Sequence, residues 1–310
     1  MCMEEWIPSV KKLGSNVQSR LSFAQSQFKS GDYDKAMAEV DVALQMDPGD
    51  PDALLLKAKI LYDRGEFESS VAIARQAAAG MPDQAKPHLL IAAVRYEQNN
   101  TEAALAAADT AIATEPANAQ AWLLRGNLLG ALDRFAEAEP AFRRAIELNP
   151  QLTMAHRQLG RILGDRGDQA AALACIEQAL LLDPNNGLVR SNLGDLYRSM
   201  GRLDDAIKAY REATRLNPRL EYAYIAAGDL YLQINRLEEA QIEYRRAIQL
   251  RGKCAKAQFG MARLYLQTGD IEAARAQLEA AIKTDPNFEA AITLLATLPP
   301  ATDGASLGET

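Results

Sequence analysis

The stretch that decides the fold is LGDLYRSMGRLDDAIKAY, residues 193–210. Leu193 and Leu196 are spaced as on one face of a helix, Gly201 interrupts the pattern, and a second apolar stripe starts at Ala206. Glycine favours the left-handed backbone that ends a helix. The stretch therefore predicts two helices joined by a tight turn, with small residues where the helices touch.

Prolines mark a period of 34 residues along the chain. They stand at Pro48, Pro82, Pro116, Pro150, Pro184, Pro218 and Pro286, and Gly252 occupies the position that lacks one. Self-similarity at a fixed period of this length indicates a repeat architecture. The register predicts eight repeats, at 17–50, 51–84, 85–118, 119–152, 153–186, 187–220, 221–254 and 255–288. We expect an N-terminal cap helix or extension over 1–16, a capping helix over 289–298 and a flexible tail over 299–310.

The predicted turn between the two helices falls at the same position in every repeat. This position holds glycine in most repeats, asparagine at Asn99 and Asn235, and aspartate at Asp133. We expect left-handed backbone there. One residue conflicts with this local pattern, because Pro140 lies inside a predicted helix over 135–148, where it removes a backbone hydrogen bond and predicts a bend.

The pattern resembles the tetratricopeptide repeat, a helix-turn-helix unit of 34 residues. The matching residues are Leu193, Gly194, Tyr197, Ala206, Tyr210, Ala213 and Pro218 in the sixth repeat, and Trp122, Gly126, Phe142, Ala145 and Pro150 in the fourth. The resemblance implies an all-α fold, a right-handed superhelical solenoid whose first helices line a concave groove. It also implies a protein that binds other proteins and has no catalytic activity.

Composition excludes several other classes. The formal net charge of -7 argues against a nucleic-acid partner, and no apolar stretch is long enough for membrane insertion. The cysteines are odd in number and scattered, and the two histidines lie 68 residues apart, so we expect no metal site, no cofactor and no catalytic residues. We expect a cytoplasmic protein, with a periplasmic one left open if a leader has been removed.

The family's geometry assigns positions two, five, nine, twelve and thirteen of each repeat to the groove. With Asn192, which lies one position further round, the candidate peptide-binding residues are Leu55, Leu89, Leu123, Asn127, Arg157, Arg161, Asn192, Asp195, Arg198, Tyr222, Phe259 and Arg263. Basic residues outnumber acidic ones at the groove positions, which favours a partner with acidic groups. The alternative for Leu55, Leu89 and Leu123 is that they pack between neighbouring helices as core.

The resulting hypothesis is a non-enzymatic scaffold that binds an extended or helical segment of a partner protein in the groove. Two alternatives stay open. The chain is the substrate-recruiting arm of a larger enzyme of the glycosyltransferase or sulfotransferase type, or it assembles with copies of itself into a homo-oligomer.

Overall fold

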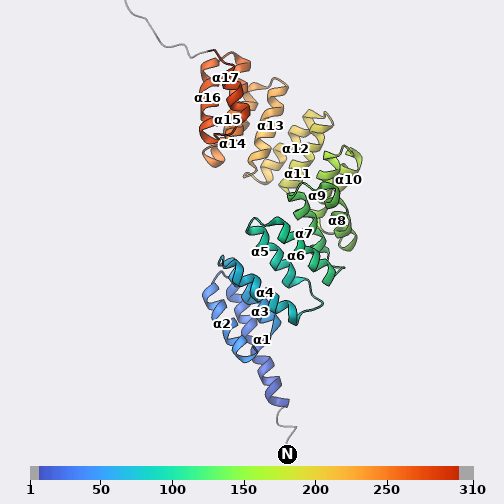
Figure 1. Ribbon diagram of the computed structural model, residues 1–310. Helices are drawn as coiled ribbons and strands as arrows, with labels where there is room; N and C mark the ends of the chain where they lie inside the picture. Colours follow the sequence, from blue (N-terminus) through green and yellow to red (C-terminus); the bar gives the residue numbers. More distant parts are fainter. Residues whose placement is uncertain (1–6, 300–310) are drawn as a thin grey trace, which may run out of the picture. The chain divides into compact units, whose positions relative to one another are not determined.

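The computed structural model describes residues 7–299, apart from the side chains of residues 7–16 and Arg251, and within this range it contains helices and no strand (Figure 1). The helices are α1 (Ile7–Lys29), α2 (Tyr33–Met46), α3 (Pro51–Asp63), α4 (Phe67–Gly80), α5 (Lys86–Glu97), α6 (Thr101–Thr114), α7 (Ala119–Ala131), α8 (Phe135–Leu148), α9 (Thr153–Asp165), α10 (Gln169–Leu182), α11 (Gly187–Ser199), α12 (Leu203–Leu216), α13 (Glu221–Gln233), α14 (Leu237–Arg251), α15 (Ala255–Thr268), α16 (Ile271–Thr284) and α17 (Glu289–Ala296). The predicted all-α class is confirmed.

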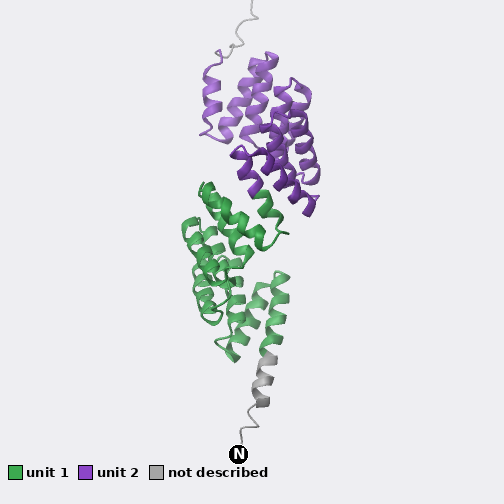
Figure 2. Ribbon diagram, turned by 90° about the vertical axis from the view of Figure 1, so that its right-hand side faces the viewer, with its two compact units in different colours: residues 1–158 green, residues 159–310 purple. Residues whose placement is uncertain are grey.

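The chain divides into two compact units, residues 1–158 and 159–310, which we call unit 1 and unit 2 (Figure 2). In unit 1, helix α1 packs on α2, α3 on α4, α5 on α6 and α7 on α8. In unit 2, α11 packs on α12, α13 on α14 and α15 on α16, and α17 lies against α16. In both units, consecutive helices thus form pairs, and each pair also contacts the next one along the chain.

The ends of the chain fall partly outside the described residues. Helix α1 begins at Ile7 and runs without a break to Lys29, so the predicted N-terminal cap is continuous with the first helix of the first repeat. Residues 1–6 and 300–310, which include most of the predicted tail, lie outside the description.

The left-handed turns occur where the sequence predicts them. The backbone angle φ is positive at Gly201 and at the equivalent residues of the other repeats, including Asn99, Asp133 and Asn235. Some helix starts also follow from the local sequence, because the Asp50 carboxylate accepts a hydrogen bond from the Ala53 amide at 2.7 Å at the start of α3. Local sequence therefore accounts for the turns within the repeats and for helix starts of this kind.

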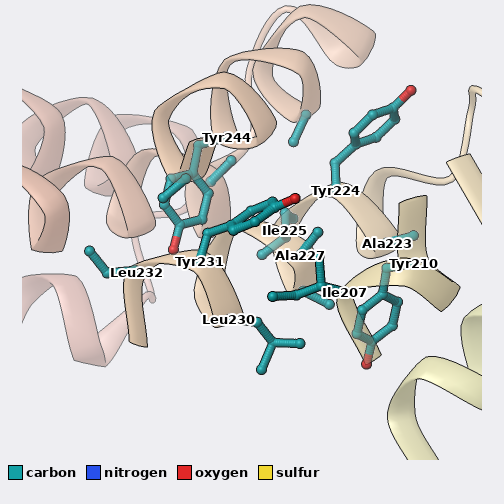
Figure 3. Packing of buried hydrophobic residues seen from close by; sticks show 14 of the residues in the cluster. Ile207, Tyr210, Ala223, Tyr224, Ile225, Ala227, Leu230, Tyr231, Leu232 and Tyr244 are labelled. Atoms are coloured by element: carbon teal, nitrogen blue, oxygen red, sulfur yellow. The ribbon is translucent and has the colours of Figure 1, made fainter. Parts of the chain in front are cut away.

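The core of unit 2 depends on glycines that face aromatic rings. Tyr210 and Tyr244 are completely buried among alanines and leucines of α12, α13 and α14 (Figure 3). A Cβ atom added to Gly194 would lie 2.7 Å from Cε1 of Tyr210, and one added to Gly228 would lie 2.7 Å from Cε1 of Tyr244. Paired helices approach this closely only because these positions have no side chain.

Candidate functional site

The first helices of unit 2 carry a network of hydrogen bonds centred on Asp195. Its Oδ1 accepts from the Tyr210 hydroxyl at 2.7 Å and from Arg198 Nη2 at 3.2 Å. The hydroxyl of Tyr222, which comes from the next first helix, also donates to Oδ1. Two causes raise the pKa of Tyr222 above its ordinary value: burial, which is the larger, and the hydrogen bond to Asp195. Asp195 therefore joins α11, α12 and α13 through hydrogen bonds.

A second carboxylate repeats this arrangement one repeat further along. Asp229 Oδ1 accepts from the Tyr244 hydroxyl at 2.8 Å and from Arg263 Nη1 at 3.2 Å. Asp229 follows Asp195 by one repeat length, and in both cases the tyrosine comes 15 residues after the aspartate. The two networks hold the first helices of unit 2 in register and present hydrogen-bonding groups along one face.

A small hollow lies between α9 and α11 beside Asp195. Its volume is about 60 Å³, and its lining consists of Gly160, Arg161, Gly164, Asp165, Ile176, Asn192, Asp195, Leu196 and Ser199. The Asn192 Nδ2 atom is buried and has no hydrogen-bond partner among the described residues. A buried amide donor without a partner costs free energy.

Two of the three predicted groove leucines are buried. Leu55 and Leu123 are 5% and 7% exposed, and Leu55 packs in the core of unit 1. Leu89 is partly buried and packs against the cluster of Ala85, Ala111 and Ala121. Leu55 and Leu123 therefore offer little surface to a partner, and the assignment of Leu89 to the groove stays a prediction.

Three of the groove arginines form ion pairs with neighbouring aspartates. Arg161 pairs with Asp165, Arg198 with Asp195 and Arg263 with Asp229, each at 3.2 Å. Arg157 is partly buried on α9. Because each of the three paired arginines has a carboxylate beside it, the face offers directed hydrogen bonds more than net charge.

The remaining candidates differ in how far they reach the surface. Tyr222 is half exposed, and its ring stands edge-on to Tyr210 with centroids 6.3 Å apart. Phe259 packs on Phe288, centroid to centroid 5.2 Å, near the C-terminal end of unit 2. In unit 1, the Asn127 side-chain oxygen accepts from Gln158 Nε2 at 3.2 Å. The residues of unit 2 around Asp195 and Asp229 thus combine exposure with a defined network.

Several contributors to this site were not predicted. Tyr210 was predicted only as part of the repeat pattern and Tyr244 was not predicted, although their hydroxyls donate hydrogen bonds to the two aspartates. Gly164 was not considered, although it opens the hollow. The repeated interval between aspartate and tyrosine was visible in the sequence and is the signal that could have revealed the two networks.

Other classes of site were searched in the described part of the chain. No group of three or more histidine, cysteine, aspartate or glutamate side chains is placed to hold a metal ion there. Over the same residues, every helix lacks either the length or the apolar character that crossing a membrane requires.

Models of one repeat family match along most of the chain. The model described as TPR repeat matches residues 194–234, and models described as tetratricopeptide repeat match 27–94 and 243–298, 89–153, 175–208, and 157–186 with 221–254. No curated protein matches the sequence.

Several solved structures share the fold. The crystal structure of the APC/C hetero-tetramer Cut9-Hcn1 matches with a TM-score of 0.66 at 19% identity, over 95% of this chain and 58% of that one. PilW, a type IV pilus biogenesis factor, matches with a TM-score of 0.62 at 19% identity, over 68% of this chain and 98% of PilW. The C-terminal part of a repeat protein from Cytophaga hutchinsonii matches with a TM-score of 0.54 at 16% identity, over 77% and 98%. This chain therefore spans little more than half the length of the Cut9-Hcn1 chain it matches.

Proposed function

The chain belongs to the tetratricopeptide repeat family, and we propose that it is a non-enzymatic scaffold that holds an extended segment of a partner protein. We further propose that its helices form eight repeats with the bounds set by the proline register. The partner segment lies along the first helices of unit 2, where Asp195 and Asp229 organise the surface.

The observation that carries this proposal is the unpartnered donor at Asn192. Its Nδ2 atom is buried at the hollow between α9 and α11 and has no hydrogen-bond partner among the described residues. A carbonyl oxygen of a bound segment would satisfy it, and half-exposed Tyr222 would supply apolar contact nearby. The hollow holds one small group and not a whole ligand, which favours an anchor point along an extended chain.

Pairing of the groove arginines changes the partner that we expect. Arg198 and Arg263 already have aspartate partners, so an acidic segment would have to displace an existing ion pair. A segment that binds through backbone carbonyls and small polar side chains avoids this cost. The chain of Cut9-Hcn1, which has the same fold, belongs to a hetero-tetramer, and this supports a role in protein assembly.

A phage-displayed peptide library selected on the full chain tests the proposal. We expect enriched peptides to bind the Asn192→Ala variant on the order of tenfold more weakly, which is the loss of about one buried hydrogen bond. The matched control is Gln249→Ala, which removes an exposed amide from α14, and it should leave binding unchanged. Failure to enrich any peptide, or equal binding of the enriched peptides to Asn192→Ala, would exclude this site.

A further inference from the structure

A separate basic hollow of unit 2 is lined by residues of α12, α13 and α14. It has a volume of about 630 Å³ and is lined by Lys208, Arg211, Glu212, Thr214, Arg215, Tyr224 and Arg246. These residues come from α12, α13 and α14. Four of the seven are basic and one is acidic, in a chain whose net charge is -7. A concentration of one sign against the overall charge points to a ligand of the opposite sign.

Most of these basic side chains have one carboxylate partner each. Arg215 pairs with Glu212 at 2.6 Å, and Lys208 with Asp205 at 3.6 Å. Arg211 is exposed, and no described carboxylate lies within ion-pair distance of it. Its guanidinium is therefore the group with the most capacity to bind an added anion, since it presents a fork of donors that fits carboxylates and phosphates.

The floor of the hollow is fixed by buried polar residues. Thr214 and Tyr224 are 8% and 9% exposed, and the Thr214 hydroxyl donates to the Arg211 carbonyl at 3.0 Å. Figure 3 shows the Tyr224 hydroxyl pointing away from the ring of Tyr231. Glu243, which does not line the hollow, is 5% exposed and accepts from Arg246 at 3.3 Å. Burial raises the pKa of Glu243, and the positive charges of Arg246 and Arg211 oppose that rise. Arg246 makes the direct hydrogen bond to this buried carboxylate, so Arg211 is the better residue to substitute.

We propose that this hollow binds a segment of a partner protein that carries closely spaced acidic groups, either carboxylates or phosphorylated hydroxyls. Both groups accept bidentate hydrogen bonds from arginine. The hollow is open to solvent and mostly polar, so a small apolar ligand would gain little there. A long polyanion such as nucleic acid would extend beyond the basic patch and meet the negative charge of the remaining chain. A short acidic segment engages the patch alone.

This site is independent of the segment proposed for the first helices. It lies on α12, α13 and α14, whereas the Asn192 hollow lies between α9 and α11. The experiments therefore separate the two sites, because Asn192→Ala leaves the basic hollow unchanged.

Fluorescence anisotropy with the full chain tests the proposal. The probes are labelled oligoglutamate, the same peptide with phosphoserines in place of glutamates, neutral oligoglutamine, and oligothymidylate. We expect one or both acidic peptides to bind and oligoglutamine not to bind. The Arg211→Glu variant should weaken acidic-peptide binding on the order of tenfold, because it replaces an attraction with a repulsion.

Arg245→Glu is the matched control. Arg245 holds the same repeat position on α14, is exposed, and does not line the hollow. It should leave binding within about twofold of the wild type, the difference expected from long-range charge alone. Preference between the two acidic peptides identifies the source of the anionic groups. Absence of binding, equal weakening by both variants, or oligothymidylate binding as tightly as the peptides would each overturn the proposal.

Discussion

Replacing Gly194 with alanine tests the idea that close helix approach holds unit 2 together. The added Cβ would lie 2.7 Å from Tyr210 Cε1 and 2.8 Å from Cδ1, well inside van der Waals contact. The ring cannot pivot freely, because its hydroxyl donates to Asp195 at 2.7 Å. Overpacking in a core costs about 1–3 kcal/mol, and losing a hydrogen bond to a charged group costs about 1.5–3 kcal/mol. Alanine has a higher helix propensity than glycine, and this difference stabilises the variant by about 1 kcal/mol.

The expected net result is a loss of about 1.5–5 kcal/mol in the free energy of unfolding. Gly164→Ala is the control in the same unit, since its Cβ would lie 3.6 Å from Leu196 Cδ1 and 3.8 Å from Ala172 Cβ. These are ordinary contacts, so this variant should gain up to about 1 kcal/mol. Urea unfolding of the full chain, followed by far-ultraviolet circular dichroism, measures both. Midpoints that shift in the same direction for the two variants would refute the reasoning.

Two further predictions concern the backbone and a thiol. Helix α8 continues through Pro140, which is exposed and lacks the amide hydrogen of a helix interior, so Pro140→Ala should raise the free energy of unfolding by about 2 kcal/mol. Pro51→Ala, at the first position of α3, should give no gain in the same urea experiment, and a gain there would contradict the explanation. Burial and a hydrogen bond to Glu221 raise the pKa of Cys254 to about 11. The rate at which iodoacetamide alkylates this thiol should therefore be low near neutral pH and should increase as the pH approaches the pKa. Peptide mapping checks this, and alkylation at neutral pH as fast as that of glutathione would disprove it.

Much of the local structure could be predicted, because it depends on residues close together in the chain. The left-handed turns at Gly201 and Asn235 and the cap at Asp50 need only a few neighbouring residues, and the structure has all of them. His156 follows Trp122 by one repeat length. Its Nε2 atom lies 3.0 Å from the Pro150 carbonyl oxygen, just as Trp122 Nε1 lies 2.9 Å from the Pro116 carbonyl oxygen. The predicted bend at Pro140 stays a prediction.

The sequence by itself determined the period, the helix pairs and the small residues that let those pairs touch. These features follow from backbone preferences and from spacing, which repeat identically in every repeat. Only the tertiary structure decided which repeated positions are exposed and which charges are already paired. Leu55 and Leu123 are buried in the core, and Arg198 and Arg263 form ion pairs with aspartates. The buried Nδ2 atom of Asn192 has no hydrogen-bond partner among the described residues. Burial and ion pairing depend on side chains from neighbouring helices, so the position of a residue within its own repeat does not predict them.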